Sequence, residues 1–242
     1  YLTATNIAAS SGPSLPQIDN GHSMTFDGVD DYIQAAIPVD GWNDATLRTF
    51  SFWIKIDTLG ASYTPFFCGY GILNAFRYSN SCGIRTHLGV SKLRWSLEVF
   101  AASTGCYYET EAIDGSGAAP DLTDGNWHHI VIYNPVDSTA NKGDIVNCKI
   151  WLDGSLLTGT GYPGTLAVRG FTSGRLCFGA GNRGGSSAQI YLDGNIDEFA
   201  YWNRELSDPE VLSIYNATTT ALTADLNELS GGKPDAWYRM GD

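Results

Sequence analysis

The chain of 242 residues contains 28 glycines, 12% aromatic residues and only 17% charged residues, a balance that favours a well-packed sheet protein over a disordered or fibrous chain. It carries 14 Lys and Arg against 26 Asp and Glu, which gives a net charge of −12 at pH 7. This charge argues against a nucleic-acid partner, since phosphate binding needs clustered Lys and Arg. No apolar run approaches the roughly 20 residues that cross a bilayer, so we expect no membrane span.

Turn signals divide the chain after its first segment. Residues 1–20 are small, rich in Ser and Pro and weakly patterned, which predicts an extended N-terminal arm. The dipeptide Asp-Gly then recurs, beginning at positions 27, 40, 114, 124, 153 and 193. Asp-Gly suits tight hairpin turns because glycine tolerates positive φ. Six such turns predict many antiparallel strands.

Several segments alternate apolar and polar residues with the period of two that a half-buried strand has. In residues 50–57, Phe52 belongs to the apolar face and Trp53 to the opposite one. Residues 146–152 alternate likewise, and there the inner face is expected to begin at Val146. Each of these segments therefore presents one face to a core.

The stretch from Tyr191 to Asn216 contains the one helix that the sequence predicts. Ser207 and Glu210 have the spacing of a capping box, which marks the start of a helix. Helical periodicity is almost absent before Ser207. We therefore predict a single all-β domain, a jelly-roll β-sandwich, with one short helix near the C-terminal end.

Six motifs follow one another along most of the chain. In order they read SMTFDGVDDYI, FSFWIKID, DGNWHHIVIY, KIWLDGSLL, RLCFGAGN and GNIDEFAYWNRELS. These motifs resemble laminin-G-like domains of the concanavalin A-like lectin/glucanase superfamily. The resemblance implies a concanavalin A-like sandwich over residues 21–216. It does not imply one function, because the superfamily includes lectins, adhesion modules, enzymes and structural parts of viruses.

One strand of the family pattern is displaced. Domains of this type usually begin with a strand that resembles A-Y-W-x-x-D-G, which does not occur in residues 1–20. Residues 217–242 instead read as a linker plus a C-terminal strand, Ala236–Asp242, with a leader that resembles stretches in phage tail and surface proteins. The strand could close its own sandwich, insert into the next subunit or belong to a tandem array, and a disordered tail is the alternative. For assembly, the contact residues would be Trp237, Tyr238 and Met240.

The five cysteines lack zinc-like spacing, and in an acidic, Lys-poor chain they favour an oxidising location, extracellular or on a virion surface. We expect two disulfides and one free thiol. The alternative is five small buried hydrophobes. The candidates are Cys68, Cys82, Cys106, Cys148 and Cys177.

Signals for catalysis are weak. Glucanases that resemble this fold carry carboxylates as E-x-D-x-x-E on one strand, with the acid and the nucleophile about 5.5 Å apart. Glu109, Glu111 and Asp114 come nearest to this pattern, but its final Glu is missing. The histidines have no neighbouring Ser or Cys motif and are expected to be structural; they are His22, His87, His128 and His129. We therefore predict no catalytic residue and no enzymatic activity.

Calcium is the cofactor that the sequence suggests. The resemblance implies a ligand at Asp197 of the Ile-Asp-Glu motif. Asp27, Asp30 and Asp31 offer further hard oxygens, of which calcium takes six to eight. The alternative is that Asp197 bonds a turn and Asp27 belongs to a hairpin.

Sugar binding would need aromatic side chains exposed beside polar ones. The candidates in expected loops are Trp42, Tyr107, Tyr108 and Tyr162, with Tyr70 as a further one. Most aromatic residues in such a chain belong to the core, which is the competing interpretation.

Two functions stay open on these observations. The leading hypothesis is a non-enzymatic structural or surface subunit of a virion, tail fibre or extracellular filament, which assembles with its own copies or with neighbouring subunits through the C-terminal strand. The alternative is a carbohydrate-binding adhesion module, lectin-like and calcium-dependent, with cell-surface glycans as partners.

Overall fold

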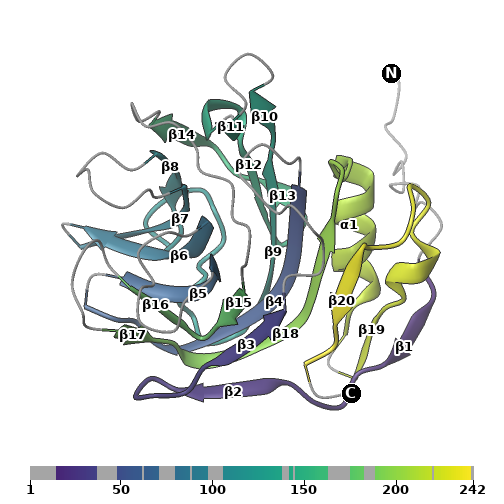
Figure 1. The fold of residues 1–242 in the computed structure, drawn as a ribbon, viewed down its shortest axis with the longest axis horizontal. Helices are drawn as coiled ribbons and strands as arrows, with labels where there is room; N and C mark the ends of the chain where they lie inside the picture. The colour runs from purple at the N-terminus through teal and green to yellow at the C-terminus, as the bar shows by residue number, and fades with distance from the viewer. Residues whose placement is uncertain are drawn as a thin grey trace, which may run out of the picture.

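The computed structural model describes residues 15–36, 48–61, 63–70, 80–87, 89–97, 106–137, 142–143, 145–162, 175–182, 189–219 and 221–240. Within them two seven-stranded antiparallel sheets face each other (Figure 1). The predicted all-β sandwich with a short helix near the C-terminal end is confirmed. No helix of the described residues is long and apolar enough to cross a membrane.

Strand β4 lies near the centre of the first sheet. At one edge of this sheet are two strands that come from the two ends of the described chain. Its order is β13 (Ser155–Leu156), β12 (Lys149–Leu152), β9 (Trp127–Asn134), β4 (Arg48–Thr58), β18 (Asp193–Trp202) and β2 (Met24–Asp27), with β20 (Ala236–Tyr238) also on β18.

The second sheet covers one face of the first. Its order is β14 (Gly159–Tyr162), β8 (Cys106–Ala112), β7 (Val90–Leu97), β6 (Asn80–His87), β5 (Tyr63–Tyr70), β15 (Arg175–Phe178) and β3 (Ile33–Ala36). Three small pairs are β1 (Gln17–Asp19) with β19 (Leu222–Ala224), β10 (Val136–Asp137) with β11 (Lys142–Gly143), and β16 (Ala180–Asn182) with β17 (Gln189–Tyr191).

The main core fills the space between the sheets, as the alternation of β4 predicts. Phe52 is fully buried there, and its ring lies 6.0 Å from that of Phe66 on β5 and 6.1 Å from that of Phe199 on β18. The prediction for Val146 is wrong, because the 3-10 helix η1 (Ile145–Asn147) interrupts the alternation and leaves that side chain 54% exposed.

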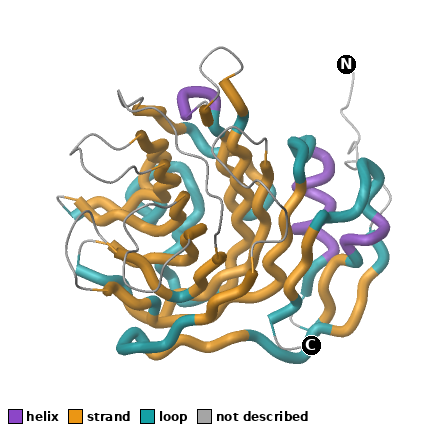
Figure 2. The backbone as a smooth tube through the Cα atoms, viewed as in Figure 1, coloured by secondary structure: helices purple, strands orange, loops and turns teal. Residues whose placement is uncertain are grey.

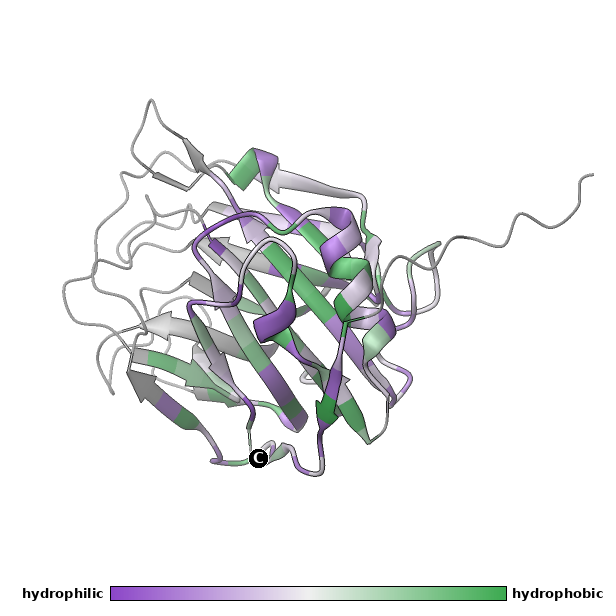
Figure 3. Ribbon diagram, turned by 90° about the vertical axis from the view of Figure 1, so that its right-hand side faces the viewer, coloured by the Kyte–Doolittle hydropathy of each residue, from purple (hydrophilic) through white to green (hydrophobic). Residues whose placement is uncertain are grey.

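A second layer covers the other face of the first sheet. Helix α1 (Asp208–Ala217) and the 3-10 helix η2 (Leu226–Glu228) lie on the side away from the second sheet (Figure 2). Figure 3 shows α1 and the C-terminal segment across the strands. Buried side chains of this layer include Trp151 and Trp202 of the sheet and Ile214 of the helix.

The predicted capping box begins α1. The backbone N–H of Ser207 donates to Glu210 Oε2 at 2.9 Å, and the Arg204 guanidinium lies 2.8 Å from Glu210 Oε1. Because Trp151 Nε1 also donates to Asp208 Oδ1 at 3.0 Å, the first turn of the helix is fixed to the sheet.

The C-terminal strand pairs within its own chain. Strand β20 runs antiparallel to β18, with Trp237 opposite Ala200 and Tyr238 opposite Phe199. It occupies the same edge of β18 as β2, further along the strand. Of the three arrangements that the sequence left open, the structure has closure in cis. Tyr238 and Met240 pack against the main core, and Trp237 packs against the second layer.

The end of the expected N-terminal arm also pairs. Strand β1 is antiparallel to β19, with Ile18 opposite Thr223, so residues 17–19 are not a free arm. Residues 1–14 lie outside the described residues.

Three cysteines are free thiols buried in the sandwich, namely Cys82, Cys148 and Cys177. Burial raises the pKa of the Cys82 thiol well above its ordinary value. Two disulfides are therefore excluded, because only Cys68 and Cys106, whose side chains lie outside the description, could still form a bond. The three described thiols behave as small hydrophobes, the alternative that the sequence left open.

Candidate functional site

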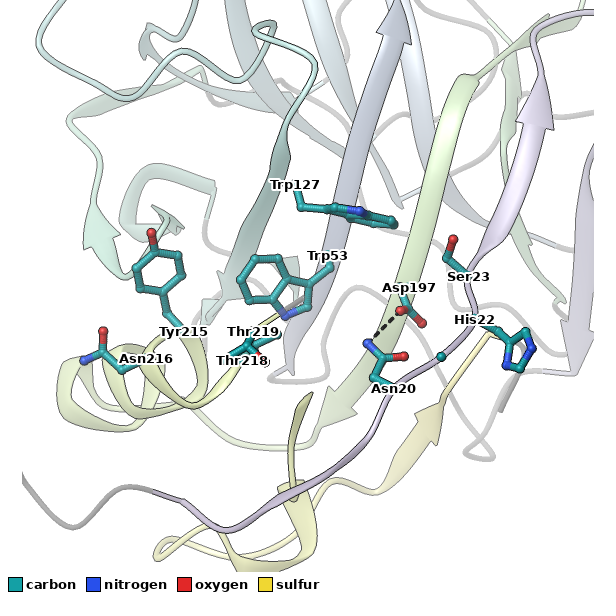
Figure 4. Close-up of a pocket in the computed structure, with 11 residues that line it drawn as sticks. Asn20, His22, Ser23, Trp53, Trp127, Asp197, Tyr215, Asn216, Thr218 and Thr219 are labelled. Carbon is teal, nitrogen blue, oxygen red and sulfur yellow. Dashed lines mark hydrogen bonds between the residues drawn. The ribbon is translucent and has the colours of Figure 1, made fainter. Parts of the chain in front are cut away.

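A pocket of about 570 Å³ opens on the outer face of the first sheet, beside the C-terminal end of α1 (Figure 4). The segment between β1 and β2 forms one wall and the end of α1 forms the other. The lining residues are Asn20, Gly21, His22, Ser23, Trp53, Trp127, Asp197, Tyr215, Asn216, Thr218 and Thr219.

The floor of the pocket comes from three neighbouring strands. Trp53 of β4 lies opposite His129 of β9 and also opposite Asp197 of β18. Since Phe52 and Ile54 point into the main core, the residue between them must point outward. The register thus places an indole between an imidazole and a carboxylate.

Aromatic rings form one side of the site. The Trp53 ring lies 5.9 Å from that of Tyr215 and 5.1 Å from that of His129, at interplanar angles of 14° and 27°. Trp127 at the start of β9 is 38% exposed. In the view of Figure 4 the Trp127 indole lies above Trp53, with its rings directed toward the side of Asp197. The pocket therefore offers nearly parallel rings below and a second indole at its rim.

Polar atoms form the other side. Asp197 is only 4% exposed; its Oδ1 accepts from the backbone N–H of Glu198 at 2.8 Å and its Oδ2 accepts from Asn20 Nδ2 at 3.0 Å. The amide oxygen of Asn20 is buried and has no hydrogen-bond partner among the described residues. An acceptor of this kind can bind a hydroxyl group of a ligand.

His129 supports the floor as a neutral group. Its Nε2 lies 2.8 Å from Ser51 Oγ, and burial lowers the pKa of its imidazole to about 4, although Asp153 acts in the opposite direction. The ring therefore contributes packing rather than charge at neutral pH.

A second carboxylate, that of Glu198, is next to Asp197 in the chain and is not among the described residues that line the pocket. Glu198 follows Asp197 at an irregularity of β18, where the pairing with β4 shifts and Glu198 adopts a φ of 52°. Burial, and then the neighbouring Asp197 carboxylate, raise the pKa of Glu198 to about 7. Its carboxylate accepts from Trp237 Nε1 at 2.6 Å and from Arg239 Nε at 3.3 Å. The site is thus connected to the C-terminal strand.

The structure brings three of the four calcium candidates together and places Asp197 apart from them. Asp27, Asp30 and Asp31 are exposed, and each has an oxygen within 4.8 Å of the others, but they lie at the turn after β2. Asp27 is opposite Asp193 on β18, four residues and about 13 Å of strand away from Asp197. Asp197 instead bonds Asn20 and a backbone amide, close to the alternative that the sequence left open.

The tyrosines predicted for sugar binding divide between two faces of β8. Tyr107 stacks on Tyr162 of β14 at 4.6 Å, with the Arg94 guanidinium 3.6 Å above its ring. Tyr108 is 6% exposed and belongs to the main core, because neighbouring residues of a strand point to opposite faces. Trp42 and the side chain of Tyr70 lie outside the described residues.

The acidic residues nearest to a glucanase pattern have structural contacts. Glu109 lies 3.8 Å from Arg94, Glu111 Oε1 accepts from the backbone N–H of Thr158 at 3.0 Å, and the pKa of Asp114 is lowered by its bond from Ser116.

The histidines have separate positions. His128 bridges Asp124 at 2.9 Å and Asp153 at 2.8 Å. His22 lies on the pocket wall, and the side chain of His87 is outside the description. Among the described histidines, His129 contacts a serine hydroxyl, that of Ser51, and both side chains are buried.

Sequence reasoning missed the aromatic part of the pocket. Trp53, Trp127 and Tyr215 come from β4, β9 and α1, and only the pairing of the strands brings them together. One signal was present, because Trp53 is a large apolar residue on the polar face of an alternating strand. Such a side chain must be covered by another element or line a site.

Residues 27–212 match the family model described as the concanavalin A-like lectin/glucanases superfamily, so the chain belongs to this superfamily, as the resemblance implied. The sequence matches no curated protein.

Solved structures with the same fold at low identity include two with a TM-score above 0.5. One is the CBM40 of the Ruminococcus gnavus IT-sialidase bound to α2,3-sialyllactose, with 12% identity over 84% of this chain and 99% of that chain, and a TM-score of 0.52. The other is botulinum neurotoxin type C, whose cell entry depends on interaction with two ganglioside molecules, with 13% identity over 87% of this chain and 48% of that chain, and a TM-score of 0.51. At these identities the likeness concerns the fold alone.

Proposed function

We propose that this domain is a non-catalytic carbohydrate-binding module whose ligand site is the pocket beside α1. The observation that carries the proposal is the joining of aromatic faces and buried polar acceptors in one cavity of about 570 Å³. A pyranose has apolar C–H faces and a rim of hydroxyl groups, and a pocket that joins aromatic faces with placed polar groups suits both.

The geometry indicates which side chains would contact the sugar ring and which would bind its hydroxyl groups. The Trp53 and Tyr215 rings and the partly exposed Trp127 indole supply aromatic faces for a sugar ring. Asp197 and the amide oxygen of Asn20 would accept hydrogen bonds from hydroxyl groups. The superfamily and the glycan-binding names of the two structural neighbours support this choice.

The test is a glycan array followed by calorimetry on matched variants. Trp127→Ala and Tyr162→Ala both remove a partly exposed ring, with 38% and 43% exposure, but only Trp127 lines the pocket. We expect Trp127→Ala to weaken glycan binding by about tenfold or more, the loss of roughly 1.4 kcal/mol of stacking, and Tyr162→Ala to leave it unchanged.

Weaker binding by Tyr162→Ala, with unchanged binding by Trp127→Ala, would place the ligand at the Tyr107–Tyr162 pair on the second sheet. Binding of no glycan by the intact chain would overturn the proposal itself.

The role in a virion, tail fibre or filament stays a prediction. It depended on a C-terminal strand in need of a partner, whereas β20 makes its ladder with β18 of the same chain. No contact of the described residues specifically favours assembly over binding.

A further inference from the structure

The described residues that line the pocket supply a carboxylate but no guanidinium or ammonium group. Asp197 is the only acid among these eleven residues, and none of them is Lys or Arg. Proteins usually recognise a carboxylate or phosphate through the fork of an Arg or through a Lys. The described part of the lining offers an anionic sugar no such group.

The cation next along the floor already has a partner. Lys55 is two residues from Trp53 on the outer face of β4 and lies opposite Trp127. Its Nζ is 3.3 Å from Asp57 Oδ1, and it does not line the pocket. A ligand anion would therefore meet the Asp197 carboxylate first.

We infer that the pocket selects uncharged sugars and rejects sugars that carry a carboxylate, an inference that rests on the proposed function. Two like charges about 6 Å apart, at an effective dielectric constant near 20, repel each other enough to weaken binding about a hundredfold. The same buried carboxylate and the Asn20 amide oxygen attract hydroxyl donors. This selectivity differs from that of the CBM40 neighbour, which is bound to sialyllactose.

The test compares sugars that differ in one carboxylate. The probes are methyl β-glucoside with methyl β-glucuronide, methyl β-galactoside with methyl β-galacturonide, and lactose with α2,3-sialyllactose, titrated at pH 8 so that free imidazoles are neutral. We expect the neutral member to bind about a hundredfold more tightly. Equal or tighter binding of the acidic member would overturn the inference and leave the proposed function standing. If neither member of any pair binds, the proposed function fails and the inference falls with it.

A matched pair of variants tests the cause. Asp197→Asn removes the charge at constant size, and Asp193→Asn makes the same change elsewhere on β18, outside the pocket lining. We expect the difference in affinity between neutral and acidic sugars to shrink at least tenfold in Asp197→Asn and to persist in Asp193→Asn. A gap that is unchanged in folded Asp197→Asn would contradict the inference.

If Asp197→Asn does not fold, two measurements on the intact chain replace it. Raising NaCl from about 0.05 to 0.5 M should strengthen only the acidic sugars, because salt screens like charges. The second measurement is Lys55→Gln: loss of acidic-sugar binding in this variant would show that the site attracts anions, which would overturn the inference.

Discussion

The indole N–H of Trp237 donates to the Glu198 carboxylate across 2.6 Å and thereby joins the C-terminal strand to the irregularity of β18. Arg239 bonds the same carboxylate at 3.3 Å. Glu198 is also the residue after Asp197, so one buried acid connects chain closure with the floor of the pocket.

The raised pKa of Glu198, about 7, makes the stability of the fold depend on pH. Because the folded state holds this proton more tightly than an unfolded chain, its stabilising effect is complete below about pH 4.5 and is lost as the pH rises through about 7. Glu198→Gln should remove this dependence. Between pH 5 and 8 the free energy of unfolding of the intact chain should fall by about 2–3 kcal/mol relative to the variant.

Urea unfolding at four pH values measures this difference. Glu205→Gln, which alters an exposed ion pair with Lys149, is the control. Parallel curves for the intact chain and Glu198→Gln would show that Glu198 is already ionised in the folded protein.

Removal of β20 should unfold the sandwich. The Tyr238 ring lies 6.3 Å from both Phe178 and Phe199, so a chain that ends at Lys233 exposes this part of the core and leaves Glu198 without its two partners. Tyr238→Ala alone should cost about 3 kcal/mol. Circular dichroism and light scattering of the intact chain and of the chain that ends at Lys233 check this. A multimeric intact chain with a folded monomeric truncation would instead favour assembly through the strand.

The capping box should influence ligand affinity from a distance. Glu210→Ala removes the cap of Ser207 and the ion pair with Arg204, at a cost of about 2 kcal/mol. Since Tyr215 lies in the last turn of the same helix, we expect weaker glycan binding as well. Glu228→Ala, on η2, is the control. Unchanged affinity in a destabilised Glu210→Ala would show that the sheet alone positions Tyr215.

The thiols should be unreactive in the folded chain. Cys82, Cys148 and Cys177 are buried and free, so an alkylating reagent should modify them only after denaturation. Mass spectrometry without reductant should then count at least three modified residues. Fewer than three would mean that at least one of these residues forms a disulfide.

Calcium, if bound at the turn after β2, should affect stability and not affinity. Asp27, Asp30 and Asp31 supply three carboxylates toward the six to eight oxygens that calcium takes, at a distance from the pocket. We expect millimolar calcium to raise the melting temperature of the intact chain but not of Asp30→Asn, while chelator leaves glycan affinity unchanged. A loss of glycan binding in chelator would place a calcium ion at the ligand instead.

Local patterns predicted the fold better than the site. Alternation placed Phe52 inside and Trp53 outside, and the spacing of Ser207 and Glu210 predicted the start of α1. The pocket depends on strand register and on a contact between Asn20 and Asp197, which are 177 positions apart. Such long-range pairing leaves no periodic signal in the sequence, which predicts Asp197 as a calcium ligand and not as part of this pocket.

Alternate residues of β4 serve two different purposes, the stability of the sandwich and the lining of the pocket. Phe52 and Ile54 hold the sandwich together, while Trp53 between them faces only the pocket and the outer layer. A substitution at Trp53 can therefore change what is bound with little loss of fold, whereas one at either neighbour threatens the fold first. Amide hydrogens of this strand should exchange only through global opening, so the recognition surface is as rigid as the core it backs. A lineage could thus evolve new specificities on an unchanged scaffold.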